Sequence, residues 1–368
     1  ADALRRAISN WGKNSKLLSF EHKLKQGMIN KGYTPEFADR LFNQIKGFGG
    51  YGFPESHSAS FALLAYVSAW LKCHHPAAFY VGLLNSQPMG FYSPSQLVQD
   101  AQRHHILILP TDVNHSDWDH QLLSSDDTRQ PPIRLGLRLV KGLSQAAGKR
   151  ISDVRRQRAF TNLADLRRRA SLDRKNMEAL AAADALSSIS GHRHQTHWQT
   201  MALEDHQPLL PAEASPQHET RSEVRLPTPS LGEEVLADYQ STGLSLKAHP
   251  LALLRTQYPF SQCTTQKELI RLGNHRFVRI AGLITCRQRP GTASGVVFLT
   301  LEDETGNMNV IVWPAVQERY RQALMTSQLV VIKGTVEARN DVVHVIASAL
   351  ENHSERLSTL TVASRDFH

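Results

Sequence analysis

The sequence predicts a multidomain α+β protein, in which mainly α-helical regions are followed by a five-stranded β-barrel. Three observations support this prediction. The chain has 368 residues, enough for two or three domains with cores of their own. Helical periodicity and capping signals dominate residues 1–110 and 133–186. Five short β-rich segments, separated by turn signals, fill residues 277–350.

The charge balance favours a polyanionic partner. Lys and Arg number 42 against 34 Asp and Glu, which gives a formal charge of +8 and a pI near 9.5. A basic surface attracts nucleic acid and nucleotides. An ordinary soluble protein with a basic surface is the plainer alternative. The three cysteines are widely separated and contain no C-x-x-C, which excludes a disulfide framework and a cysteine-based zinc site.

The chain has the features of a soluble protein. No signal sequence opens it, and its most apolar stretch, residues 61–71, is far shorter than the ~20 residues of a membrane span. We therefore expect a cytoplasmic protein without a membrane partner. The chain begins with "ADALRRAISN" and lacks an initiator Met, so we expect a fragment or a processed form.

The first 110 residues are predicted to be helical. In "TPEFADRLFNQIKGF", Thr34 caps a helix that Gly47 ends. A second helix, Ser58–His74, is apolar over much of its surface and is therefore expected to be buried on most sides. In "SPSQLVQDAQRHH", Ser93 or Ser95 caps a third helix, and "ILILPTDVN" continues as a short extended run.

The segment "LVKGLSQAAGKRI" has the pattern of a helix-hairpin-helix, with a glycine-centred turn over Lys141–Ser144. The amides of such a turn could hold a DNA phosphate, with basic side chains alongside. An ordinary helical hairpin is the alternative. The residues expected to bind DNA here are Lys141, Gly142, Ser144, Lys149 and Arg150.

Residues 190–232 are rich in His, Pro, Glu, Gln and Ser, which is typical of a linker. The strands that follow are "FVRIAGLIT", "GVVFLTLED", "NMNVIVWP", "LVVIKGTVEA" and "DVVHVIASAL". A helix, "AVQERYRQAL", comes after the third strand. Five strands with a helix in that place follow the order of an OB-fold barrel.

The barrel contains three aromatic residues that are either core residues or platforms for base stacking, namely Phe277, Phe298 and Trp313. The alternation along the strands does not decide between these two roles. A positive rim suits a groove for single-stranded nucleic acid. The cations expected to form it are Arg276, Arg279, Arg287, Arg289, Lys333 and Arg339.

The stretch "GFGGYGFPESHS" contains a literal G-x-G-x-x-G. A dinucleotide loop needs a preceding strand and an acidic residue about 20 positions on, and this stretch has neither, so that site is excluded. Ser56 or Ser58 is expected to cap the next helix. His57 then lies at a helix N-terminus, where free amides bind anions, and could contact phosphate. A purely capping role is the plainer alternative.

The carboxylates of the chain do not form a cluster in the sequence. Two-metal phosphoryl chemistry requires several Asp or Glu side chains at one place. The closest approach to this pattern is Asp117-x-Asp119, in a turn-rich segment without a third partner. We therefore expect no metal site and no catalytic residue in this chain.

Several segments resemble the bacterial C-family DNA polymerases, the DNA polymerase III alpha subunit family. "GFGGYGFPESHSASFALLAYVSAWLKCHHPAAFY" resembles their fingers, and "LLNSQPMGFYSPSQLVQDAQRHHILILPTDVNHSDWD" is similar to the error-prone, ImuC-type branch. "RLGLRLVKGLS", "STGLSLKAHPLALLR" and "GVVFLTLEDETGNMNVIVWP" resemble the hairpin region, the connector and the OB-fold of the same family. The motifs occur in the family's order and cover most of the chain.

The resemblance implies a carboxyl-terminal portion without the palm. The parts it implies are fingers (1–118), a helix-hairpin-helix region that binds duplex DNA (119–190), a flexible linker (191–232), a helical connector (233–272), the OB-fold (273–352) and a tail (353–368). Mg²⁺ would be held by palm aspartates outside this chain, so the fragment alone would be inactive and would bind no cofactor. In the fingers, the resemblance assigns the triphosphate contacts to Arg5, Arg6, Lys13 and His57.

The function implied is translesion synthesis and damage-induced mutagenesis. The implied partners are primer–template DNA, an incoming deoxynucleotide and ImuA- and ImuB-type proteins. Contact with the sliding clamp would be indirect, because "QTHWQT" is a poor clamp-binding motif. Ser144 departs from the hairpin pattern, which favours a second glycine there. The alternatives are a protein-interaction module that docks on such partners, or the same part of a replicative alpha subunit.

Overall fold

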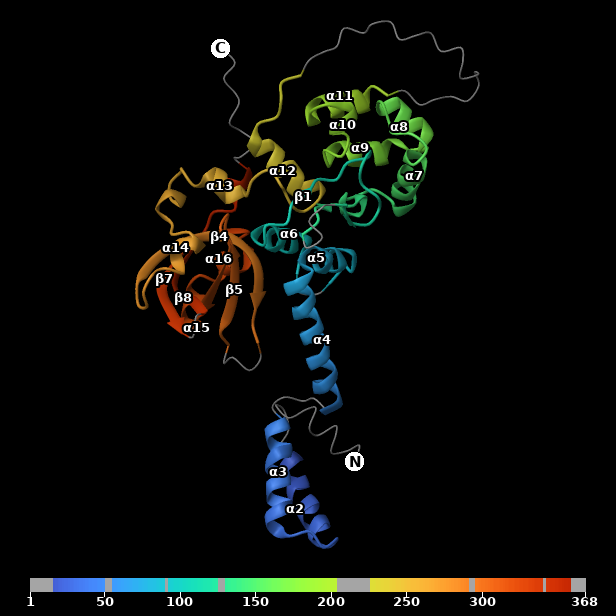
Figure 1. Ribbon diagram of the computed structural model, residues 1–368. Helices are drawn as coiled ribbons and strands as arrows, with labels where there is room; N and C mark the ends of the chain where they lie inside the picture. The colour runs from blue at the N-terminus through green and yellow to red at the C-terminus, as the bar shows by residue number, and fades with distance from the viewer. Residues whose placement is uncertain are drawn as a thin grey trace, which may run out of the picture. The chain divides into compact units, whose positions relative to one another are not determined.

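The computed structural model of the protein describes residues 16–49, 55–89, 92–124, 130–203, 226–290, 295–339 and 342–358 (Figure 1). The chain divides into two compact units, residues 1–79 and 80–368. Each unit is described by itself below.

The described part of the first unit is helical. Its helices are α2 (Lys16–Ile29), α3 (Pro35–Gly49), α4 (Glu55–His74) and the start of α5 (Pro76–Asn85), and α2 contacts α3. The Oγ1 atom of Thr34 accepts a hydrogen bond from the Phe37 amide at 3.3 Å, which confirms the predicted cap of α3. That helix continues two residues beyond Gly47, because a helical glycine costs only about 1 kcal/mol.

The helix α4 differs from its prediction in two respects. It begins at Glu55, so Ser56 and Ser58 lie inside its first turn and do not precede it as caps. The expectation that α4 is buried on most sides is wrong, since every residue from Ser58 to Leu71 is exposed. An apolar helix surface predicts burial, but it does not say whether the covering element belongs to the same segment of chain.

The second unit begins within α5, and helix α6 and a small three-stranded sheet follow. Ser93, rather than Ser95, caps α6 in a capping box with Gln96. The sheet has the order β1-β3-β2, with β1 parallel and β2 antiparallel to the central strand. The bounds are α6 Pro94–Arg103, β1 Ile108–Leu109, β2 Gln121–Leu122 and β3 Ile133–Arg134.

A helical body with one hydrophobic core follows the sheet. The helix predicted before the glycine turn is a short 3-10 helix, η2, and Ser144 caps the helix after the turn by accepting from the Ala147 amide at 3.2 Å. The bounds are η2 Leu137–Leu139, α7 Gln145–Arg155, α8 Leu163–Arg169, α9 Arg174–Ala182, α10 Ser187–Ser190 and α11 Arg193–Met201.

Helix α11 corrects the predicted linker, because it lies inside residues 191–232 and packs against α9. Composition suggested a linker there because the segment is polar. In helix α11, however, several polar side chains bond within the fold. Arg193 is buried and its guanidinium bonds to Glu234 and Asp238 of the next helix.

The connector and the barrel complete the second unit. The connector contains α12 (Leu231–Ser241), α13 (Pro250–Leu254), η3 (Phe260–Gln262) and α14 (Gln266–Leu269). The barrel strands are β4 (Phe277–Gln288), β5 (Val297–Glu302), β6 (Asn307–Val312), β7 (Leu329–Arg339) and β8 (Val342–Asn352). The helices α15 (Pro314–Arg319) and α16 (Arg321–Thr326) come after the third strand, and α17 (Glu355–Ser358) follows the barrel.

The barrel is closed in the order β4-β5-β6-β8-β7, and its only parallel pair among the described strands is β6 with β8. This topology confirms the predicted α+β fold with a five-stranded OB barrel. Alternate residues of each strand point inward and form one core of Val, Leu, Ile and Met side chains. Closure requires a close approach at Gly334, where a Cβ atom would lie 2.4 Å from the Ile346 carbonyl oxygen.

Candidate nucleic-acid interface

The outer face of β5 and β6 carries two exposed aromatic side chains. Phe298 points outward, because its neighbours Val297 and Leu299 belong to the barrel core. Trp313 follows the inward Val312 and also points outward. Their exposed fractions are 36% and 51%, so neither is a core residue. The structure thus resolves, for these two positions, the choice that the sequence left open.

The strand register extends this aromatic pair into an apolar row. Phe298 pairs with Ile311 on β6, and Ile311 pairs with Ile346 on β8. The apolar row stops at Ile346, because the next residue in register is the polar Thr335 of β7, and only beyond it lies Phe277 of β4, which is 69% exposed. Strands lie about 4.8 Å apart, so these side chains form a continuous track across β5, β6 and β8.

A polar row lies beside the apolar one. Thr300 of β5 pairs with Asn309 of β6, which in turn pairs with His344 of β8. The Nδ1 atom of His344 is buried and has no hydrogen-bond partner in the described part of the chain. Apolar platforms next to hydrogen-bonding side chains suit a flat, polar-edged ligand such as a nucleic-acid base.

Some cations of the predicted basic rim are exposed to solvent, whereas others bond to protein groups. Arg276 and Arg289 are exposed at the two ends of β4. Arg287, in contrast, donates to the carbonyl oxygens of Leu324 and Ser327 at the end of α16, and burial lowers its pKa. Its guanidinium therefore holds a helix in place.

Two further rim cations lie opposite each other on the paired strands β4 and β7, and each bonds to another protein group. Arg279 donates to the Oε1 atom of Gln262 at 2.8 Å, and Lys333 forms an ion pair with Glu351 at 2.6 Å. The hydrogen bond from Lys333 holds the pKa of the Glu351 carboxyl below its usual value. The side chain of Arg339 lies outside the described residues.

Most of the groups predicted to bind DNA at the hairpin turn form hydrogen bonds to other groups of the protein. The Leu143 amide donates to the Val140 carbonyl at 3.2 Å, and the Ser144 amide donates to the Asn176 side chain at 3.3 Å. Gly142 adopts a φ of +88°, which explains the glycine at this turn. The predicted phosphate cradle is therefore partly occupied by internal contacts.

The cations of the hairpin are also distributed differently from the prediction. The Nζ atom of Lys141 donates to the carbonyls of Tyr239 and Gln240 at 3.0 and 2.9 Å, at the end of α12. Arg150 donates to the carbonyls of Ala170 and Ser171. Lys149 is exposed at the surface of α7. Of the three predicted cations, Lys149 is thus the one whose charge the described contacts leave available for a phosphate.

The residues predicted to bind the nucleotide are mostly not described. Arg5, Arg6 and Lys13 lie outside the described residues. The backbone of His57 lies in the first turn of α4, but its side chain is also outside the description. Their phosphate contacts remain predictions.

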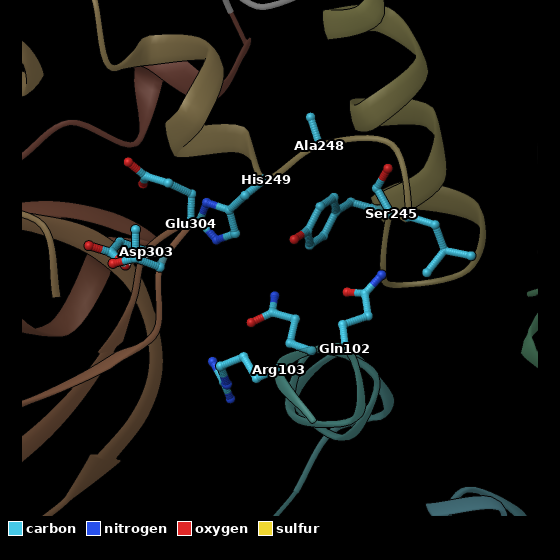
Figure 2. A pocket seen from close by; sticks show the side chains of 11 residues that line it. Gln102, Arg103, Ser245, Ala248, His249, Asp303 and Glu304 are labelled. Carbon is cyan, nitrogen blue, oxygen red and sulfur yellow. Dashed lines mark hydrogen bonds between the residues drawn. The ribbon is translucent and has the colours of Figure 1, made fainter. Parts of the chain in front are cut away.

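A cavity of about 300 Å³ lies where α6, the connector and the β5–β6 turn meet. Figure 2 shows side chains from all three elements around it, among them Gln102 and Arg103 of α6, His249 of the connector and Glu304 of the turn. No pattern in the sequence marked these residues as a group, because they come from segments about 150 and 50 positions apart.

A buried acid–imidazole contact lies at the edge of this cavity. The Nδ1 atom of His249 accepts from the Leu251 amide at 3.2 Å, so the proton belongs on Nε2, which lies 3.3 Å from the Oε1 atom of Glu302. Gln99 of α6 donates to the same oxygen at 2.6 Å. Burial, and next the charge of Glu302, raise the pKa of Tyr239. This junction ties the helical part of the unit to the barrel.

The described residues offer no metal centre. Asp117 and Asp119 form ion pairs with Arg155 and Arg138, and the second pair has a distance of 2.8 Å. Within the ranges that the structure describes, no group of three or more His, Cys, Asp or Glu side chains is placed to hold a metal ion. No described helix is both long and apolar enough to span a membrane.

Comparisons with known proteins agree with this arrangement. A family model described as a helix-hairpin-helix motif matches residues 105–196, and one described as an OB-fold nucleic acid binding domain matches residues 278–352. Curated relatives named error-prone DNA polymerase match the whole chain. They come from Teredinibacter turnerae (54% identity), Saccharophagus degradans (53%) and Methylococcus capsulatus (50%).

The match covers 100% of this chain and 36% of each of these three relatives. It confirms the resemblance to the error-prone branch of the C-family polymerases that the motifs indicated. The chain is therefore homologous, over its whole length, to a part of the error-prone DNA polymerases.

Proposed function

We propose that the chain is the carboxyl-terminal nucleotide- and DNA-binding part of an error-prone DNA polymerase that acts in translesion synthesis and damage-induced mutagenesis. The observation that supports this most directly is the outward row of Phe298, Ile311 and Ile346 beside Trp313. It lies across strands two, three and five of the barrel, and strands two and three form the face with which OB-folds bind oligonucleotides.

Each part of the chain has a proposed partner. The barrel holds single-stranded template, and the hairpin body holds the backbone of the primer–template duplex through Lys149. The incoming deoxynucleotide binds Arg5, Arg6, Lys13 and His57. Mg²⁺ is held by carboxylates that lie outside these 368 residues, so the chain alone does not polymerise. The cytoplasm is the proposed location.

The first experiment measures binding of the chain to a fluorescent primer–template with a single-stranded overhang, at 50 and 200 mM salt. We expect affinity to fall with salt, because phosphate contacts release counterions. A blunt duplex serves as the control and should bind more weakly. Absence of binding at 50 mM salt would contradict the proposal.

The assignment of His57 needs the intact enzyme. His57→Ala should raise the KM for the nucleotide or lower kcat, and leave DNA affinity unchanged, because the side chain would contact only the triphosphate. Ser58→Ala, in the same helical turn, is the matched control. Unchanged nucleotide kinetics in His57→Ala would remove this residue from the nucleotide site.

A second candidate function is docking of ImuA- or ImuB-type partners, through which the sliding clamp would be reached. One observation favours it. Trp198 and Met201 of α11 are exposed beside a cavity of about 620 Å³ that α11 and α12 line. A variant with Trp198→Ala and Met201→Ala should lose partner capture in a pull-down and keep DNA binding. Retained capture would exclude this surface as the docking site.

A further inference from the structure

The positive charge of the chain is concentrated in the helical body. Residues 145–178, which run from α7 into α9, contain ten Lys and Arg against four Asp and Glu. This segment therefore supplies most of the formal charge of +8 that the 368 residues carry. A surface with such an excess attracts polyanions, provided that its cations are not neutralised by neighbouring carboxylates.

Some exposed arginines of this segment are neutralised in that way. Arg156 forms an ion pair with Asp153 at 3.0 Å, and Arg174 forms one with Glu178 at 2.8 Å. The two arginine side chains are 68% and 71% exposed. Each pair nevertheless carries no net charge that could hold an anion.

Asp165 of α8, in contrast, is one carboxylate shared by three arginines. The Nη2 atom of Arg158 and the Nη1 atom of Arg169 each lie 3.1 Å from it, on different oxygens. The Nη2 atom of Arg168 lies 3.9 Å from Oδ1, the oxygen that Arg158 contacts. The Asp165 side chain is only 6% exposed. Since arginine stays protonated in proteins, the cluster keeps a net charge of +2 around a buried carboxylate.

The three arginines of the cluster do not have the same role. The guanidinium of Arg169 donates to the carbonyl oxygens of Val154 and Arg158 and lies over the Phe160 ring, 4.9 Å from its centroid. Arg169 therefore fastens the chain that follows α7 to α8. The side chains of Arg158 and Arg168 are 65% and 60% exposed, so most of their N–H donors face solvent.

The positions of Arg158 and Arg168 suit a single phosphate group. Their Nη2 atoms contact the same oxygen of Asp165, so they lie no more than 7.0 Å apart, the sum of their distances of 3.1 and 3.9 Å to that oxygen. A phosphate accepts charge-assisted hydrogen bonds at about 2.7–2.9 Å and can bridge two donors at this separation through two of its oxygens. Two guanidinium groups this close repel each other, and the carboxylate that both contact offsets the repulsion.

We propose that Arg158 and Arg168 together bind one phosphate of the duplex DNA backbone, and that the buried carboxylate of Asp165 is the positioning group that holds the two guanidinium groups for it. This inference rests on the proposed function, since it names the groups through which the helical body holds the duplex. It places the contact at the opposite end of α7 from the hairpin turn, where the Leu143 and Ser144 amides bond within the protein. The 11 residues of α7 separate the two places by about 16 Å.

A protein partner fits this surface less well. Protein interfaces have an apolar core, whereas nucleic-acid interfaces are more polar and positively charged. From residue 130 to residue 197, all of which the structure describes, no large hydrophobic side chain is exposed. An acidic peptide is the protein ligand that two arginines could still hold, and the experiment therefore includes one.

The experiment measures the affinity of the chain for a fluorescent blunt duplex by anisotropy, between 50 and 200 mM salt. Arg158→Ala with Arg168→Ala should raise the dissociation constant at least about tenfold, because charge-assisted hydrogen bonds to a phosphate are lost. The slope of log affinity against log salt should fall by about 0.9, the value for one phosphate. Arg156→Ala with Arg174→Ala is the matched control. It removes two equally exposed arginines whose charges are balanced, and should change affinity less than about threefold.

The role of Asp165 is tested by a substitution that makes the surface more positive. Asp165→Asn removes a negative charge, so charge alone predicts tighter binding of the duplex. If Asp165 positions the arginines, the variant should instead bind about threefold or more weakly, because the two guanidinium groups are no longer held in place. Arg158→Lys with Arg168→Lys should restore the salt slope but not the full affinity, since lysine lacks the planar fork. Thermal unfolding of each variant shows that it is folded in the assay.

Unchanged binding in the double alanine variant, or an equal loss in the control variant, would overturn the proposal. Tighter binding by Asp165→Asn would refute the positioning role. A poly-glutamate peptide that lost affinity in the double alanine variant as strongly as the duplex would assign the cluster to an acidic protein segment, and would also overturn the proposal. A chain that binds no duplex at 50 mM salt would refute the DNA-binding function itself, whereas the preceding results leave that function standing.

Discussion

Removal of the aromatic side chains of the β5–β6 face tests the proposed interface directly. Phe298→Ala and Trp313→Ala each remove one candidate platform for a stacked base. Stacking of a base on an aromatic side chain contributes about 1–3 kcal/mol. Phe298 is only 36% exposed and offers one ring face, so we expect about 1 kcal/mol, whereas Trp313, at 51%, should approach the upper value. The dissociation constants should rise by about 5-fold and by up to about 150-fold.

The assay is fluorescence anisotropy with a single-stranded oligonucleotide at several salt concentrations. Neither substitution removes a cation, so the slope of log affinity against log salt should stay unchanged. Arg289→Ala, at the end of β4, should reduce that slope by about 0.7 if its guanidinium contacts a phosphate of the single strand. Thermal unfolding of each variant shows that a loss of binding is not a loss of fold.

Phe277→Ala is the matched control, because it removes the same side chain from the same barrel at a position that is more exposed. Phe277 lies on β4, and the polar Thr335 of β7 separates it from the row on β5, β6 and β8. Its replacement should change affinity less than twofold, well below the stacking effect. If Phe277→Ala weakened binding as much as Trp313→Ala, the reasoning that selects the β5–β6 face would be refuted.

Three further predictions concern groups with a structural role. Lys141→Ala should lower the free energy of unfolding by about 1 kcal/mol, because its ammonium group bonds to two carbonyls at the end of α12, while duplex affinity stays the same by anisotropy. Burial lowers the pKa of His120 from 6.5 to about 4. The unfolded chain therefore binds the extra proton first, and stability should fall by about 3 kcal/mol between pH 6.5 and pH 4 in chemical denaturation; His120→Asn should remove that fraction of the pH dependence. Gly334→Ala places a methyl group against the Ile346 carbonyl oxygen and should cost about 2–4 kcal/mol in the same assay, whereas Gly273→Ala, whose Cβ would meet nothing within 4 Å, should be nearly neutral.

Contacts between distant segments account for the functional groups that sequence reasoning missed. The polar junction of Gln99, His249 and Glu302 joins three elements, and no local pattern links them. Contacts with a distant segment also explain why the prediction for Lys141 was incomplete. A lysine next to a hairpin turn suggested a phosphate contact. The fold places the end of α12 beside Lys141, and its ammonium group donates hydrogen bonds to the carbonyls there.

The order of local elements was determined by the sequence alone. Alternating apolar residues and turn signals between positions 277 and 350 were enough for the barrel, because period-2 burial and short connections leave few other topologies. Local capping chemistry likewise identified Thr34, since the cap and its partner lie three residues apart. The resemblance to the error-prone polymerases also came from contiguous motifs.

Tertiary structure decided everything that depends on which surface is covered. Phe298 and Trp313 could have faced either way, and only the closure of the barrel put them outside. The polar helix α11 became part of the helical body because α12 supplies partners for Arg193. The apolar sequence of α4 favours burial, yet the structure leaves every residue from Ser58 to Leu71 exposed, because burial depends on a second surface that the helix sequence does not specify.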